Sequence, residues 1–296
     1  MLELAEWFAG GERVPVTLSD GKGRSRTYHI FCRVVGSGPW VTFLHGFPTC
    51  SWDWAKIEPA LQARHRLLLF DFLGFGDSDK PTAHHYSIFE QADLTQALWR
   101  HYGIAQTALV AHDYGDTVAT ELLARQAEGK LDTHVTRAVL LNGGIYVDVY
   151  KPLLIQTLLR QPVLGPAISR LINERSFARS FRAIFSPRHP ISEAEMRQHW
   201  AAIQRRDGTR NYHALIGYIS ERHAQRKRWE QMIERSPTPL HFIWGTADPV
   251  SGGPIAARLR ERAAHTDIME LVGVGHYPQI EVPAVVSEAL VVALDR

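Results

Sequence analysis

Asp113 stands where a short apolar run, residues 107–110, passes into a helical pattern that begins at Thr117. The sequence between them, AHDYGD, places small residues two positions before and two positions after this aspartate. Small residues suit a sharp strand-to-helix turn, because backbone and side chains approach closely there. A carboxylate with an ordinary pKa of about 3.9 is already an anion at neutral pH and needs no base before it attacks. Asp113 is therefore a candidate nucleophile, and the alternative is that it only caps the following helix.

Two further polar residues follow apolar runs later in the chain. Asp248 comes just after the predicted strand 239–244, and His276 follows the predicted strand 268–272. Ligand sites in open parallel sheets gather at the carboxyl ends of the strands, so both side chains can meet Asp113 in one crevice. A carboxylate that orients a histidine enables that histidine to activate water. The order Asp113, Asp248, His276 is the nucleophile, acid, histidine order of one group of hydrolases.

The motif HGFP follows the predicted strand 40–44 and comprises His45, Gly46, Phe47 and Pro48. At this place we expect an oxyanion hole, with the N–H of Phe47 joining the N–H of Tyr114. If Asp113 forms an ester, the oxyanion develops on its own carboxyl group, so both donors must point at the nucleophile.

His45 and His112 flank the predicted site and raise the question of a metal. No third histidine or carboxylate stands beside them at metal-ligand spacing, so a hydrogen-bonding role near the oxyanion loop is favoured. The glycine-rich stretches 36–38 and 273–275 lack the acidic partner of a dinucleotide site and are predicted to be turns. We expect neither a metal nor a cofactor.

These residues require a sheet that brings distant segments together, and the apolar pattern predicts one. Strands are predicted at residues 13–18, 26–35, 40–44, 66–70, 107–110, 135–141, 239–244 and 268–272. Helical patterns at residues 52–63, 88–102, 117–127, 255–263 and 282–294 alternate with most of them. This alternation favours parallel pairing in an α/β sheet covered on both faces. Residues 145–236, here named the cap segment, hold only proline-broken helical patterns, which predicts a core in two parts, 1–144 and 237–296, with a helical cap between them.

Composition excludes several classes of protein. In 296 residues, 45% hydrophobic content and a net charge of +2 are typical of a globular chain without a general affinity for nucleic acid or anionic lipid. Two cysteines indicate no disulfide framework and favour a reducing compartment. The first residues carry acidic side chains where a secretion signal would be basic, and no apolar run approaches about 18 residues. We therefore expect a cytoplasmic protein without a membrane span.

Taken together, these motifs resemble the α/β-hydrolase family, and within it the epoxide hydrolases and haloalkane dehalogenases, which use aspartate as the nucleophile. The resemblance covers nearly the whole chain. It is carried by HGFP, DFLGFGDSDKP (71–81), HDYG (112–115), the helical cap, Asp248 and His276. LNGGIY (141–146), KPLLIQTLL (151–159) and HYPQIE (276–281) look like the mesoderm-specific transcript branch of that family. Two departures are Tyr114, where tryptophan is common, and Asp116, where glycine is common.

The resemblance implies a hydrolase that forms an ester between Asp113 and a small hydrophobic epoxide, then hydrolyses the ester to a diol with water activated by His276 and Asp248. In epoxide hydrolases, cap tyrosines hydrogen-bond the epoxide oxygen. RNYH (210–213) resembles the segment that holds one of them, which favours Tyr212, with Tyr218 as second choice. Either tyrosine could instead simply pack between helices. A haloalkane dehalogenase with the same triad and a ligand-binding protein with vestigial turnover are the alternatives.

Overall fold

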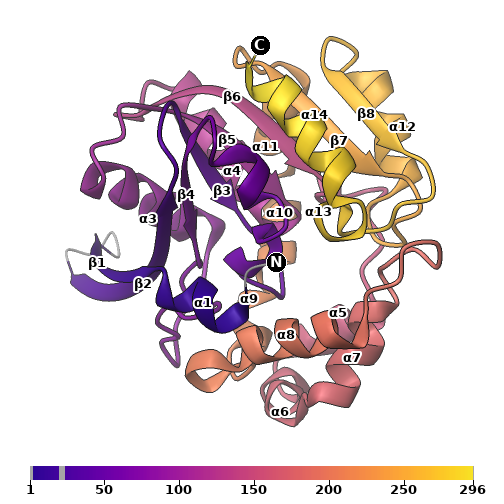
Figure 1. Cartoon of the computed structure of the whole chain (residues 1–296). Coiled ribbons are helices and arrows are strands. Elements are labelled where there is room, and N and C mark those ends of the chain that lie inside the picture. Colours follow the sequence, from indigo (N-terminus) through magenta and orange to yellow (C-terminus); the bar gives the residue numbers. More distant parts are fainter. Residues whose placement is uncertain (1–2, 20–23, 296) are drawn as a thin grey trace.

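The computed structural model describes residues 3–19 and 24–295, and its centre is an eight-stranded sheet in the order β1-β2-β4-β3-β5-β6-β7-β8 (Figure 1). The strands are β1 (Glu12–Ser19), β2 (Ser25–Val35), β3 (Trp40–Leu44), β4 (Arg66–Phe70), β5 (Gln106–His112), β6 (His134–Leu141), β7 (Leu240–Gly245) and β8 (Asp267–Leu271). Pairs β1–β2 and β2–β4 are antiparallel, and every later pair is parallel. All eight predicted strands and the α/β class are confirmed.

Alternate residues of the central strands pack into two hydrophobic cores on opposite faces of the sheet. Leu109 of β5 belongs to one core and its neighbour Val110 to the other, as the two-residue period of a strand requires. The first core receives side chains of α3 (Ile88–His101), α4 (Tyr114–Ala127) and α12 (Gly253–Arg262). The second receives α1 (Leu4–Ala9) and α14 (Pro283–Asp295). The sheet is thus covered on both faces, and its strand ends remain available for a site.

Between β6 and β7 the chain forms helices and loops. The helices are α5 (Leu154–Leu159), α6 (Leu164–Leu171), α7 (Glu174–Arg182), α8 (Glu193–Gln204), the 3-10 turn η2 (Arg205–Asp207), α9 (Tyr212–Leu215), α10 (Tyr218–Ala224) and α11 (Arg226–Glu234). Figure 1 shows α5 to α8 grouped to one side of the sheet. The absence of strands from the cap segment is confirmed for its whole length, residues 145–236, all of which the structure describes. No helix within the described ranges combines the length and apolar character needed to cross a membrane.

The prediction of one helix over residues 52–63 was wrong. The chain there forms a 3-10 turn, η1 (Ser51–Trp54), and then a separate short helix, α2 (Glu58–Leu61). Pro59 lies at the start of α2, where its missing N–H is tolerated, whereas inside a longer helix it would break a hydrogen bond. In addition, α4 begins at Tyr114 rather than at the predicted Thr117, and α1 was not predicted at all. The earlier start of α4 brings its first turn next to Asp113.

A further short helix, α13 (Pro278–Glu281), follows His276.

Candidate active site

Asp113, Asp248 and His276 lie at the carboxyl-end edge of the sheet, after β5, β7 and β8 respectively. All three side chains are buried, and only 3% of the Asp113 surface is exposed. The parallel order β5-β6-β7-β8 places these strand ends along one edge, so residues separated by 163 positions share one site. The three side chains therefore lie at one edge of the sheet, where the sequence predicted that they would meet.

Asp113 occupies a strained turn between β5 and α4. Its backbone φ of 47° and ψ of −104° are rarely adopted by a residue other than glycine. The turn is tight, because a Cβ on Gly115 would lie 2.3 Å from the carbonyl oxygen of Leu44. Asp113 stands at the N-cap position of α4, yet its side chain makes no capping hydrogen bond. The simple capping role that the sequence allowed is therefore not what this carboxylate performs.

The Asp113 carboxylate is instead held by the donors expected from the sequence. The N–H of Phe47 donates to its Oδ2 over 3.1 Å, and the N–H of Tyr114 acts on the same carboxyl group by lowering its pKa. Burial raises the pKa of Asp113, while His276, Arg222 and these two N–H groups act in the opposite direction. The N–H of Phe47 is thus already aimed at the group on which an ester carbonyl would accumulate negative charge, and the N–H of Tyr114 acts on the same group.

Asp248 is fixed by a set of hydrogen bonds that leaves its carboxylate facing His276. His276 Nδ1 lies 2.7 Å from Asp248 Oδ2, and the same oxygen accepts from Asn142 Nδ2 at 2.9 Å and Ser251 Oγ at 2.6 Å. The other oxygen accepts the N–H of Val250 at 2.7 Å. These bonds fix the orientation of the imidazole through Nδ1, so Nε2 is the ring nitrogen that Asp248 does not engage.

Asn142, the first residue after β6, was not among the sequence-predicted site residues. Its amide donates to both Asp248 and the carbonyl of Gly245, and Gly245 N–H donates back to its Oδ1. Its φ of 44° falls in the left-handed region, which asparagine tolerates better than most residues. The sequence did contain a signal for Asn142, because it is a polar residue directly after the apolar strand β6. This strand pairs with β7, which Asp248 follows.

The charges of His276 and Asp248 depend on one another. Burial alone would lower the pKa of His276, but the carboxylate of Asp248 and its hydrogen bond outweigh burial and raise that pKa to about 9. Burial likewise opposes ionisation of Asp248, and His276 reverses the effect, so the pKa of Asp248 is lowered. Asp113 contributes to the raised pKa of His276 as well. A proton on His276 is therefore favoured while Asp113 is an anion and less so once that charge is lost.

The supporting residues of the HGFP motif hold the oxyanion loop by hydrogen bonds. His45 Nδ1 bonds the carbonyl of Gly46 at 2.8 Å, and its Nε2 accepts the N–H of Phe72 at 3.0 Å. Burial lowers the pKa of His45 to about 3, so this ring is neutral. His112 Nε2 lies 2.7 Å from the carbonyl oxygen of His276, which ties the nucleophile turn to the histidine loop. Among the residues that the structure describes, no group of three or more His, Cys, Asp or Glu side chains is arranged to hold a metal ion.

The two cap tyrosines differ in what their hydroxyls do. The hydroxyl of Tyr212 donates to the carbonyl of Pro48 over 2.8 Å, so its hydrogen is already engaged. Tyr218 is 1% exposed, and its hydroxyl has no hydrogen-bond partner within the described residues. Its ring packs against Tyr114 at 4.9 Å and Phe47 at 6.0 Å between centroids, beside both oxyanion donors. Of the two tyrosines named by the sequence, Tyr212 therefore has a hydroxyl engaged by the protein, whereas the hydroxyl of Tyr218 is not engaged by any described residue.

Arg222 is a second residue that sequence reasoning missed. It lies one turn after Tyr218 on α10, is 3% exposed, and its charge acts on Asp113. Its position four residues after a candidate tyrosine was the only available hint, because helical residues four apart share a face.

Comparison with known proteins identifies the family and the fold of the chain. Residues 39–283 match the model of the family described as alpha/beta hydrolase fold. The chain is 40% identical over 285 residues to "Putative hydrolase LipZ" of Mycobacterium tuberculosis, covering 96% of this chain and 95% of that protein. It is 41% identical over 269 residues to the "Mesoderm-specific transcript homolog protein" of Homo sapiens, covering 88% and 80%. Among solved structures, haloalkane dehalogenase DatA of Agrobacterium tumefaciens C58 superposes with a TM-score of 0.78 at 21% identity, covering 97% of each chain.

Proposed function

The chain belongs to the alpha/beta hydrolase fold family, and from the side chains at its site we propose that it opens epoxides to diols through an ester on Asp113. The observation that carries this proposal is the buried hydroxyl of Tyr218, which has no hydrogen-bond partner among the described residues and interacts electrostatically with the carboxylate of Asp113. An alkoxide leaving group needs such a donor, whereas a halide does not need a proton.

In the first step, a carboxylate oxygen of Asp113 attacks one epoxide carbon as the C–O bond to that carbon breaks. The epoxide oxygen takes the hydroxyl proton of Tyr218, and the product remains bound as a neutral ester. His276 then gives up its proton and Tyr218 is restored, because loss of the Asp113 charge removes one of the interactions that hold the pKa of His276 high.

In the second step, neutral His276 takes a proton from water as the water oxygen attacks the ester carbonyl. The N–H groups of Phe47 and Tyr114 stabilise the oxyanion on the former carboxylate. Collapse breaks the bond between the carbonyl carbon and the alkyl oxygen, and the departing alkoxide takes the proton of the acid so formed. Asp113 is again an anion and His276 again carries a proton.

Haloalkane dehalogenation with the same triad is the second candidate, since the fold matches that of a haloalkane dehalogenase. The residues in the two positions from which N–H donors would hold a halide are Phe47 and Tyr114, and neither side chain offers such a donor. A ligand-binding protein with vestigial turnover would have no need of the four hydrogen bonds that fix Asp248. Both alternatives are less well supported than epoxide opening.

A single turnover in heavy-oxygen water tests the proposed function. Because water attacks the carbonyl carbon, the oxygen newly bonded to the substrate comes from Asp113, and the solvent oxygen remains on the enzyme. With enzyme in excess over a styrene-type epoxide, we expect unlabelled diol and a labelled peptide containing Asp113. Labelled diol with an unlabelled peptide would exclude the ester, and faster halide release from bromoalkanes than diol formation would favour the dehalogenase.

A further inference from the structure

Arg222 carries a buried positive charge between two aromatic rings. Its guanidinium carbon lies 4.3 Å from the ring centroid of Tyr150 and 4.9 Å from that of Tyr218. Rings at these distances interact with the faces of a guanidinium and leave its edges, where the N–H groups lie, for hydrogen bonds.

The N–H groups of Arg222 make no hydrogen bond to the described part of the chain, although the hydroxyl of Tyr150, which donates to Gln156 Oε1, also acts on the guanidinium. None of its three nitrogens has a hydrogen-bond partner among residues 3–19 and 24–295, and the side chain is only 3% exposed. A buried guanidinium without acceptors is costly, because it has lost its hydration and gained no hydrogen bonds in exchange. Such a cation therefore fits a ligand that brings the missing acceptors.

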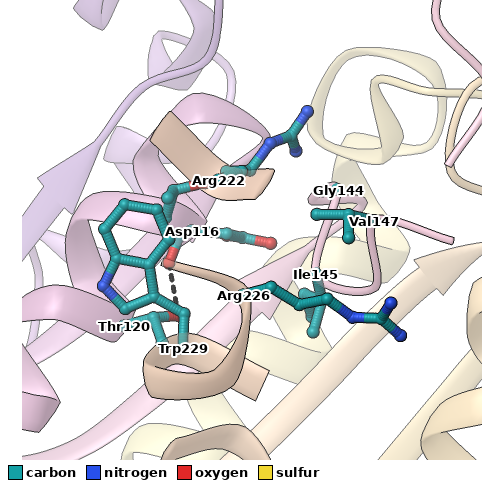
Figure 2. Close-up of a pocket in the computed structure, with 9 residues that line it drawn as sticks. Asp116, Thr120, Gly144, Ile145, Val147, Arg222, Arg226 and Trp229 are labelled. Atoms are coloured by element: carbon teal, nitrogen blue, oxygen red, sulfur yellow. Dashed lines mark hydrogen bonds between the residues drawn. The ribbon is translucent and has the colours of Figure 1, made fainter. Parts of the chain in front are cut away.

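The loop after β6 is shaped to admit this side chain. A Cβ on Gly144 would lie 1.6 Å from Nη1 of Arg222, so only glycine leaves room for the guanidinium at its position. A cavity of about 20 Å³, bordered by Arg222, Asp116 and Gly144, lies beside it. Figure 2 shows these residues converging from α4, α10 and the loop. A space of this size holds about one water molecule, the scale of a single polar group.

The nearby acids do not act as dedicated counter-ions. Both carboxyl oxygens of Asp116 lack hydrogen-bond partners within the described residues, so no hydrogen bond joins Asp116 to Arg222. Burial raises the pKa of Asp116 well above its usual range and Asp113 raises it further, while Arg222 acts in the opposite direction. Asp113 does interact with Arg222, but alkylation converts its carboxylate to a neutral ester. From that point until the ester is hydrolysed, the guanidinium needs another anion.

We propose that Arg222 anchors a carboxylate group carried by the substrate, so that the epoxides this protein opens are epoxy acids. The inference rests on the proposed function for the reacting group, while the anchor itself rests on the buried and unpartnered guanidinium. A planar fork of N–H donors matches a carboxylate in a bidentate manner, which a lysine cannot reproduce.

A binding experiment without any epoxide tests the anchor by itself. Calorimetry compares butanoate with its neutral analogue butanamide on the wild type, on Arg222→Gln, and on a matched control, Arg160→Gln. Arg160 is an exposed arginine of the cap segment that donates to Ser220 Oγ at 3.0 Å. We expect the wild type and the control to bind butanoate about 10- to 100-fold more tightly than butanamide, the range of a charge-assisted hydrogen-bonded pair, and Arg222→Gln to lose this preference. Equal binding by the wild type, or a preference that survives in Arg222→Gln, would overturn the inference.

A kinetic experiment then links the anchor to the reaction. For 3,4-epoxybutanoate against 3,4-epoxybutanamide, we expect Arg222→Gln to lower kcat/KM about 10- to 100-fold more for the acid than for the amide, with Arg222→Lys in between, because the loss of a charge near Asp113 affects both substrates whereas the loss of the anchor affects only the acid. Melting curves establish the folded fraction of each variant. Equal loss for acid and amide at equal folded fraction would show that Arg222 serves the leaving oxygen instead, and would refute the anchor. If the binding preference holds but neither epoxide is opened, the anchor stands and the proposed function fails.

Discussion

Tyr218→Phe and Tyr212→Phe remove the same atom from two buried tyrosines that lie near Phe47, yet the structure predicts opposite consequences. The hydroxyl of Tyr218 has no partner in the described part of the chain, so its loss breaks no hydrogen bond. The hydroxyl of Tyr212 donates to the carbonyl of Pro48, so its loss leaves that oxygen without this donor. The first change should affect chemistry and the second stability.

The magnitudes follow from these contacts. Leaving a buried acceptor unsatisfied costs about 1 to 3 kcal/mol. For 296 residues, the entropy of unfolding is about 0.6 kcal/mol per kelvin, so Tyr212→Phe should lower Tm by about 2 to 5 °C. Tyr218→Phe should leave Tm unchanged or slightly raised, because a desolvated hydroxyl is removed. Loss of one preorganised donor should slow formation of the Asp113 ester by a factor of about 10 to 1,000 in Tyr218→Phe.

Ester formation is measured by rapid quenching and intact-protein mass spectrometry. Each tyrosine variant is combined with His276→Gln in this experiment, so that the ester accumulates. Calorimetric melting of the single variants gives Tm. Slower ester formation in Tyr212→Phe but not in Tyr218→Phe would refute the assignment of the donor. A loss of Tm in Tyr218→Phe as large as that in Tyr212→Phe would refute the claim that its hydroxyl is unpartnered.

Three further predictions concern the triad. Asp113→Asn should reduce diol formation more than about 100-fold with an unchanged melting curve, because a neutral amide is a poor nucleophile; more than about a hundredth of wild-type activity without deamidation would contradict this. His276→Gln should show one added substrate mass by mass spectrometry, since only the second step needs the base, and an unmodified mass at saturating substrate would argue against the ester. The pKa of His276 is about 9 in the folded protein and about 6.5 when unfolded, so its charged form stabilises the fold by up to about 3 kcal/mol below pH 6.5, and this is lost as pH rises through 9. Urea unfolding of the wild type and His276→Gln should therefore differ at pH 6 and converge by pH 10; a constant difference would contradict the assignment.

Much of the candidate site could be predicted from the sequence, because short local patterns indicate where its polar residues lie. A small residue on each side of Asp113 predicts a sharp turn, and polar residues at the ends of apolar runs predict a common edge. Only the alternation of strands and helices was needed to place Asp113, Asp248 and His276 together. Their proposed roles follow from residue type and order, which do not depend on how the cap packs.

Only the tertiary structure decided which buried polar side chains find hydrogen-bond partners from distant parts of the chain. The difference between Tyr212 and Tyr218 depends on whether Pro48, 164 residues before Tyr212, presents its carbonyl to one of them. Asn142 and Arg222 each had a positional hint in the sequence, but a hydrogen bond to Asp248 and the lack of an acceptor among the described residues are properties of packed neighbours rather than of spacing. Local sequence determines the turn that carries a side chain, but the free energy of a buried polar group depends on partners that only folding brings within reach.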